Sequence, residues 1–305
     1  SRAQRGGVGR VYFAPILRTL GMKALSSPTL QGMAWMLLAS LAGTLIDTGV
    51  KALSSHYDTP QIVLGRLVFG LPFVLLIAGF RGDLKNLKPK RWPGHGLRAV
   101  LSCGATFGFF FALGELPLTL LVALSFTAPL LIAVLAWPLL GEPLGWRRGL
   151  AIVVGLAGVW VMINPGNAPW NPAYLAVAGS VLCWAGLSLS ARRMAEEPAG
   201  AMVLSTMPVS LVLAGTLTVS SWVPLEAWSL AIFLGVGAAG ATLHFSVIMA
   251  YRLAQAATVA PMEYAAVLWA SLFGALFFGE VPNGPMIAGA GLIITAGLIV
   301  LRARE

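Results

Sequence analysis

The sequence predicts an all-α integral membrane protein with ten transmembrane helices, arranged as two inverted five-helix repeats. Of its 305 residues 58% are hydrophobic and only 10% are charged, and the mean hydropathy is +0.84, which excludes an ordinary water-soluble domain. The apolar runs reach about 20 residues, the length that an α-helix needs to cross about 30 Å of hydrocarbon. A stretch near the middle of the chain also recurs near its end.

Ten apolar segments follow a basic N-terminal arm over residues 1–29, which carries five Lys or Arg residues and no acidic residue. We expect this arm to be cytoplasmic. The segments are separated by short connections with Pro, Gly or charged residues. The expected spans are 31–53, 60–80, 97–114, 118–140, 146–163, 172–191, 201–220, 228–250, 256–278 and 284–301.

The distribution of basic residues predicts the orientation. With ten spans, eighteen of the twenty Lys and Arg residues fall on one side of the membrane, Lys51 falls on the other, and Arg66 lies within a span. The positive-inside rule then places both termini in the cytoplasm. Because these charges lie between apolar segments and form no single basic face, we expect a lipid bilayer and no nucleic acid as the partner of the chain.

The recurring stretch covers residues 118–142 and 256–280. Each copy ends in Gly-Glu, at Gly141-Glu142 and Gly279-Glu280, and the two pairs are 138 positions apart. We therefore expect one five-helix repeat over residues 30–165 and a second over 166–305. An odd number of crossings inverts the second repeat, and inverted repeats are typical of secondary transporters, whose site lies between the halves.

These features resemble a known family. The repeats, Arg66 in the second span after Pro60, the Gly-Glu at the end of each fourth span and Pro129 are similar to the EamA branch of the drug/metabolite transporter superfamily. Within it the chain is most similar to the YddG-type bacterial amino-acid exporters. The resemblance implies a ten-helix inner-membrane carrier that exports amino acids, aromatic and other neutral ones included, and related metabolites.

An ionisable side chain within the bilayer costs at least about 2.5 to 3.5 kcal/mol on insertion scales, so each one is a functional candidate. Glu263 is the first, because small residues follow it along one face of its predicted helix. Its counterpart in the first repeat is Ser125, which breaks the symmetry of the halves. Glu263 is expected to face the interior and to take a substrate ammonium group or a proton; the alternative is a Glu bonded to a neighbouring helix end.

His244 lies on a similar small-residue face of the span before Glu263, so the two residues, or His244 and Tyr264, are expected to share a cavity. The pKa range of histidine is compatible with proton coupling, although a buried histidine bonded to a backbone carbonyl is the commoner arrangement.

Asp47 and Arg66 are expected at similar depths on the external side, with Lys51 one turn beyond Asp47. An ion pair that fixes helix packing is the favoured interpretation. The alternatives are an external gate and a binding point for a substrate carboxylate.

Aromatic residues in the middle of spans provide the other pathway candidates, while most Trp residues near span ends fit the interfacial belt. The candidates retained for the pathway are Trp35, Phe107, Phe110 and Trp184. We expect the Gly-Glu pairs to be structural: Gly ends one helix in a left-handed cap, and Glu begins the next. Cys103 and Cys183 have the pattern of small core residues.

Other functions fit less well. A carrier of a drug, nucleobase or nucleotide-sugar is the alternative within the same class, but Arg66 alone would have to neutralise a phosphate. The sequence has no HExxH, DxxD or GxSxG motif, so we expect no enzyme, no metal and no cofactor. A structural membrane protein would need no inverted repeat. We expect a small-molecule substrate and a monomer or weak homodimer.

Overall fold

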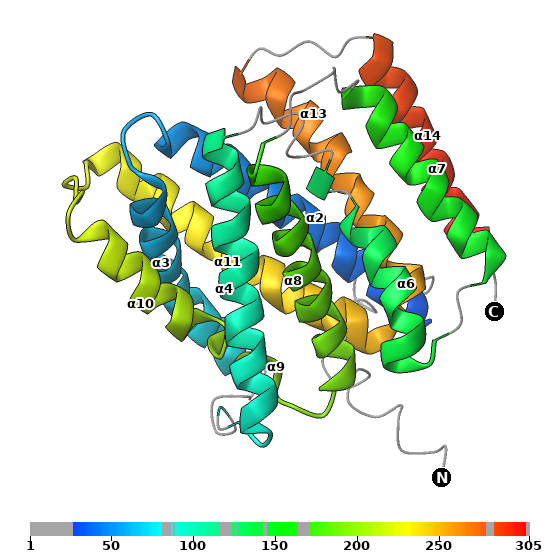
Figure 1. Ribbon diagram of the computed structural model, residues 1–305, viewed down its shortest axis with the longest axis horizontal. Helices are drawn as coiled ribbons and strands as arrows, with labels where there is room; N and C mark the ends of the chain where they lie inside the picture. Colours follow the sequence, from blue (N-terminus) through cyan, green and yellow to red (C-terminus); the bar gives the residue numbers. More distant parts are fainter. Residues whose placement is uncertain are drawn as a thin grey trace.

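The computed structural model describes residues 27–80, 87, 89–115, 124–125, 127–142, 145–163, 171–278 and 284–302. Every regular element in these ranges is a helix, and the helices form one bundle (Figure 1). The second Gly-Glu pair, Gly279-Glu280, and nearly all of the N-terminal arm lie outside the described residues.

The helices follow the order of the expected spans. They are α2 (Pro28–Leu53), α3 (Thr59–Phe80), α4 (Trp92–Glu115), α6 (Ala128–Leu140), α7 (Trp146–Ile163), α8 (Ala173–Arg193), α9 (Ala199–Leu204), α10 (Met207–Thr218), α11 (Ala227–Leu253), α12 (Ala256–Val259), the 3₁₀ helix η3 (Ala260–Tyr264), α13 (Ala265–Phe278) and α14 (Gly284–Arg302).

Six helical segments in the described ranges are long and apolar enough to cross a membrane, and the chain is therefore a multi-pass membrane protein. Two of the expected spans are interrupted helices. The seventh divides into α9 and α10, with Pro208 in the first turn of α10, and the ninth divides into α12, η3 and α13, with Pro261 at the start of η3. Proline removes a backbone donor and favours such breaks. The expected fourth span lies partly outside the described residues.

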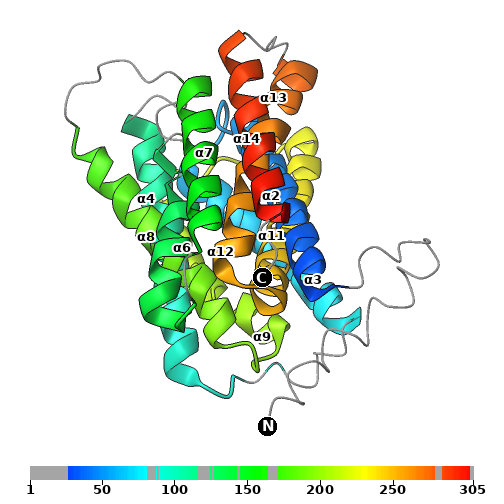
Figure 2. The same cartoon turned by 90° about the vertical axis from the view of Figure 1, so that its right-hand side faces the viewer.

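The main helix pairings are the same when the two halves are exchanged. Helix α2 packs on α11, and α8, which takes the place of α2 in the second half, packs on α4, the counterpart of α11. Helices α3 and α10, the second of each half, pack on each other. The fifth helices of the two halves, α7 and α14, also pack on each other and lie side by side at one flank of the bundle (Figure 1 and Figure 2). Helices of both halves therefore surround the centre of the bundle.

Glycines allow α3 and α11 to approach closely at their crossing. A Cβ atom on Gly237 would lie 2.6 Å from the backbone nitrogen of Gly70, and one on Gly70 would lie 3.1 Å from the carbonyl oxygen of Gly237. Small residues at helix crossings allow backbone contact in this way. The crossing brings Arg66 on α3 next to Gly240 on α11.

Polar contacts join the connections at each end of the bundle. At one end Gln61 exchanges hydrogen bonds with the backbone of Val223, and the Tyr57 hydroxyl lies 2.9 Å from Ser229 Oγ. At the other end Arg192 bonds Glu142. Helix α6 ends beside this contact at Gly141, whose φ of 68° confirms the expected left-handed cap.

Candidate functional site

Glu263 lies in the interruption of the ninth span. It is the fourth residue of η3, between α12 and α13, and its side chain is partly buried. Irregular backbone at this depth is tolerated where it is enclosed by protein or lines a cavity, and interrupted helices form the substrate sites of many transporters. The break in the helix and the acidic side chain thus coincide in one five-residue segment.

Two neutral donors from other helices hold the Glu263 carboxylate. The hydroxyl of Tyr251, on α11, donates to Oε1 at 3.0 Å, and the indole nitrogen of Trp184, on α8, donates to Oε2 at 3.4 Å. No described Lys, Arg or His forms an ion pair with Glu263. An acidic group without a neutralising partner, held in place by donors of a buried Tyr and a partly buried Trp, is arranged to accept a cation or a proton.

An aromatic contact continues this cluster toward α3. The ring of His244, on α11, lies 6.4 Å from the ring of Trp184, centroid to centroid. Trp269, on α13, donates to Ser40 Oγ, on α2, at 3.1 Å. The structure therefore brings together three of the residues expected from the sequence, Glu263, His244 and Trp184. We call Glu263, Tyr251, Trp184 and His244 the Glu263 cluster.

His244 also lines a small cavity between α3, α4, α10 and α11, which we call the Arg66 pocket. Its polar lining consists of Arg66, His244, Ser102, Thr206 and Ser210, and its other lining residues are Gly, Ala or larger apolar residues. Its volume is about 30 Å³, room for about two water molecules. The pocket thus meets the Glu263 cluster at His244.

Asp47 and Arg66 do not form the ion pair that the sequence favoured. Their charges interact electrostatically, but among the described residues no ion pair within 4 Å joins them. The stem of Arg66 packs toward Gly240 instead, because that residue has no side chain, and Asp47 is exposed. Lys51 is also exposed, in the last turn of α2.

Tyr264 is directed away from the pocket. A Cβ atom on Gly155 of α7 would lie 2.5 Å from the Tyr264 ring, which belongs to an apolar cluster with Val159, Val267 and Ile293. Successive residues of a 3₁₀ helix differ by about a third of a turn, so Glu263 and Tyr264 face different neighbours. The expectation that Tyr264 and His244 share a cavity is therefore corrected.

The remaining pathway candidates lie apart from the Glu263 cluster or in the surrounding core. Phe107 and Phe110 pack beside Val63 and Leu67, between α4 and α3. Trp35 packs against the main apolar core, to which Trp184 also belongs. Ser125 lies in a two-residue helical fragment between ranges that are not described.

Tyr251 is the residue of the Glu263 cluster that the sequence did not single out. It lies seven positions after His244 and so on the same helical face. The spacing from His244 was the signal in the sequence. The contact of Tyr251 with Glu263 could not be read from it, because that contact depends on how the chain turns between α11 and α12. Its side chain is fully buried.

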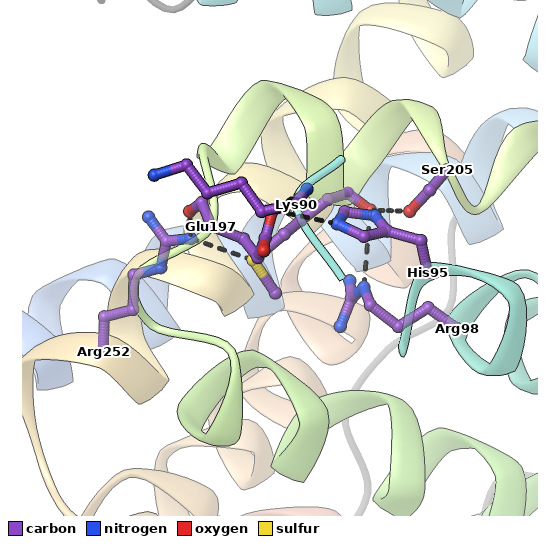
Figure 3. A network of polar contacts seen from close by, with 7 residues as sticks. Lys90, His95, Arg98, Glu197, Ser205 and Arg252 are labelled. Atoms are coloured by element: carbon purple, nitrogen blue, oxygen red, sulfur yellow. Dashed lines mark hydrogen bonds and ion pairs between the residues drawn. The ribbon is translucent and has the colours of Figure 1, made fainter. Parts of the chain in front are cut away.

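A second polar network closes the end of the bundle where α4 begins and α8 and α11 end. Figure 3 shows Lys90, His95, Arg98 and Arg252 around Glu197. Glu197 Oε2 accepts from the backbone nitrogen of Lys90 at 3.0 Å and lies 3.2 Å from His95 Nε2. Burial alone would raise the pKa of Glu197, but these two contacts outweigh it and hold the pKa below its usual value.

Glu142 joins three helices at the same end. Its Oε1 accepts from Arg192 Nε at 2.8 Å, and its Oε2 accepts from the backbone nitrogen of Ala256, the first residue of α12, at 2.7 Å. The expected role of Glu142 at the start of the following helix is thus corrected: it stabilises the N-terminus of a helix in the other half. Arg192 also donates to the carbonyls of Tyr251 and Arg252.

A multi-pass helical membrane protein with an uncompensated carboxylate, aromatic donors and a polar pocket between two similar halves has the architecture of a secondary transporter. The chain matches the EamA-like transporter family over residues 30–164 and 171–302 and belongs to it. It is therefore a transporter and not an enzyme.

Curated relatives span nearly the whole chain. The S-adenosylmethionine uptake transporter of Rickettsia prowazekii (strain Madrid E) is 26% identical over 281 residues, 90% of this chain and 94% of the relative. The riboflavin transporter of Vibrio cholerae serotype O1 is 27% identical over 274 residues, 87% of this chain and 91% of the relative. These relatives support a carrier of small metabolites, a coarser conclusion than the YddG-type amino-acid exporter suggested by the sequence.

The fold is also known from experiment. A protein of known crystal structure superposes with a TM-score of 0.77 over 91% of this chain and 99% of its own, at 21% sequence identity. At this identity the likeness shows the fold alone.

Proposed function

We propose that the chain is an alternating-access carrier of amino acids and related metabolites in the bacterial inner membrane, and that Glu263 binds the cationic group of the cargo. The observation that carries this proposal is the position of Glu263 in the break of the ninth span, with Tyr251 and Trp184 on its two oxygens and no described cation beside it. A cationic amino group would complete its coordination.

The proposed topology has ten spans, two inverted repeats over residues 30–165 and 166–305, and both termini in the cytoplasm. The exchange symmetry of the helix pairings supports the repeats, as do the two ranges matched by the family. The basic residues support the orientation. On this orientation Glu142, Arg192 and Glu197 lie at the cytoplasmic end.

The relatives suggest two candidate cargoes. The names of the relatives support S-adenosylmethionine and riboflavin as candidates. The Glu263 cluster favours the first, because S-adenosylmethionine and free amino acids carry an ammonium group and riboflavin has none. Export is the direction that the sequence resemblance implies, whereas the Rickettsia relative is named for uptake. A carrier without an energy source moves its cargo down the prevailing gradient, so we propose that the gradient sets the direction.

Counterflow in proteoliposomes tests the proposal. Vesicles loaded with unlabelled L-tryptophan, L-methionine, S-adenosylmethionine or riboflavin receive the labelled form of the same compound outside. We expect saturable exchange of at least one ammonium-bearing compound. Glu263→Gln should lower its rate at least tenfold, because one charge-assisted contact contributes about 1.5 to 3 kcal/mol.

The matched control is Glu115→Gln, which makes the same change at an exposed residue at the end of α4. Both variants should elute as folded protein from a sizing column. Normal exchange of every ammonium-bearing compound by Glu263→Gln would remove Glu263 from the site. A wild-type protein that exchanges none of the four compounds would contradict the proposed cargo class.

A further inference from the structure

We infer that the Arg66 pocket is a subsite for the carboxylate of the cargo, separate from the cation site at Glu263. This inference deepens the proposed function and rests on it. The sequence left three roles open for Arg66: an ion pair, a gate and a carboxylate contact. The structure distinguishes among them.

Arg66 is available for a ligand. Its side chain is partly buried and lines the pocket, and in the described part of the chain no hydrogen bond or ion pair joins its guanidinium to another residue. A guanidinium at membrane depth without a carboxylate partner is costly. The same group offers several N–H donors in a planar fork that matches a carboxylate.

The other polar groups of the pocket also suit an anion. None of its lining residues is acidic. Ser210 is buried, and its hydroxyl has no hydrogen-bond partner among the described residues. Such a buried hydroxyl carries a desolvation cost that an oxygen of the cargo would relieve.

A second buried cation lies next to the pocket. Arg98, which is 2% exposed, is one helical turn before the pocket residue Ser102 on α4. It donates to carbonyl oxygens of Leu187 and Met202, and no described carboxylate pairs with it. Both Arg98 and Arg66 act electrostatically on His244. The charges that act on this lining residue of the pocket are therefore both positive.

Glu197, the acidic residue of the polar network that includes Arg98, already has hydrogen-bond partners. Glu197 binds Lys90 and His95, as Figure 3 shows, and Arg252 donates to the backbone carbonyl of Glu197. Glu197 is thus held by other partners and forms no ion pair with Arg98.

The size of the pocket selects the kind of anion. A cavity of about 30 Å³, which holds about two waters, fits a group as small as a carboxylate. One guanidinium with hydroxyls is also a weak site for a dianionic phosphate, which usually meets several cations. Between this pocket and Glu263 lie the rings of His244 and Trp184, so an α-amino acid, whose ammonium and carboxylate share one carbon, contacts the two sites one after the other.

Binding of acid and amide pairs to the purified full-length chain tests the subsite without requiring transport. The probes are L-methionine with L-methioninamide and L-tryptophan with L-tryptophanamide, at a pH at which all four amino groups are protonated, so that each pair differs only in the carboxylate. Thermal unfolding is followed by light scattering at increasing probe concentration, since ligands that bind the folded state raise the midpoint. We expect the wild type to bind at least one acid about tenfold or more tightly than its amide.

Arg66→Gln should reduce this preference to near one by weakening only the acid, about tenfold to a hundredfold. Arg66→Lys should retain part of it, and Ser210→Ala should weaken the acid several-fold. If Arg66→Gln does not fold, these two variants still give the result. Asp47→Asn is the control for the ion-pair alternative and should keep the full preference.

Three results would overturn the subsite. They are equal binding of acid and amide by the wild type across both pairs, an equal loss for acid and amide in Arg66→Gln, and loss of the preference in Asp47→Asn. These results are distinguishable from failure of the proposed function. A wild type that exchanges riboflavin alone, at a rate unchanged by Arg66→Gln, would also refute the subsite but leave a working carrier.

Discussion

Replacement of Arg192 by Ala should open the end of the bundle that Glu142 closes. Arg192 lies at the end of α8, and its guanidinium joins the Glu142 carboxylate at 2.8 Å to the carbonyls of Tyr251 and Arg252 at 3.4 and 3.1 Å. The side chains of Arg192 and Glu142 are 29% and 11% exposed. Loss of Arg192 removes all three contacts and leaves a mostly buried carboxylate without its cation.

The expected effect follows from these exposures. A fully buried ion pair that loses one partner costs about 3 to 5 kcal/mol, while an exposed pair contributes at most about 1 kcal/mol. A pair with one partner nearly buried and the other 29% exposed lies between these limits, at about 2 to 3 kcal/mol. If the contacts form only while this end is closed, their loss favours the open form about 30-fold to 150-fold.

Cysteine labelling measures this shift. Thr206 lines the Arg66 pocket and is 3% exposed, so Thr206→Cys, with Cys103 and Cys183 replaced by Ser, reports access to the pocket. A membrane-impermeant maleimide added at the proposed cytoplasmic side should react at least tenfold faster after Arg192→Ala.

The matched control is Arg193→Ala, which removes the same charge from an exposed neighbour. It should leave the labelling rate unchanged. An Arg192→Ala rate equal to that of the control would refute the reasoning that this contact holds the end closed.

Two further predictions concern stability. Gly237→Ala should lower the midpoint of thermal unfolding by several degrees, because its Cβ would lie 2.6 Å from the backbone of Gly70. The control Gly235→Ala, whose Cβ would have no atom within 4 Å, should leave the midpoint unchanged. Equal midpoints for the two variants would contradict the close crossing of α3 and α11. Glu197 has a folded-state pKa below its unfolded value, so its stabilising contribution is present above the unfolded pKa and is lost as the pH falls through the folded pKa. Unfolding midpoints measured from pH 7 to pH 3 should therefore fall less steeply for Glu197→Gln than for the wild type, and parallel curves would exclude this contribution.

The sequence predicted the positions of the helices well, because a helix in a bilayer must be apolar over about 20 residues. It also singled out Glu263 as a candidate, since an acidic residue within such a run is conspicuous, and the role of Glu263 stays a prediction. The interruptions of the seventh and ninth spans were missed, although Pro208 and Pro261 were the signals: hydropathy is insensitive to a change from α-helical to 3₁₀ geometry. The number of spans and their orientation stay predictions.

The contacts between side chains were harder to predict from the sequence than the depth of each residue in the membrane. Asp47 and Arg66 were placed at similar depths, but depth along a helix does not fix direction. Arg66 packs beside Gly240, whose close approach depends on the crossing of α3 and α11. Likewise the Gly cap of α6 followed from local conformation, whereas the contact between Glu142 and Ala256 depends on how the halves are assembled.

The packing of Tyr264 against Gly155 has a mechanical consequence for the candidate site at Glu263. The Tyr264 ring occupies the space that a side chain at Gly155 of α7 would fill, and Glu263 directly precedes Tyr264 in η3. Helix α7 pairs with α14 at the flank of the bundle, where exposed residues such as Trp160 face the surroundings of the protein. A tilt of this outer pair must displace Tyr264, and with it the backbone that carries the carboxylate. The Tyr264 ring thus links the outer pair of helices directly to the segment that carries Glu263.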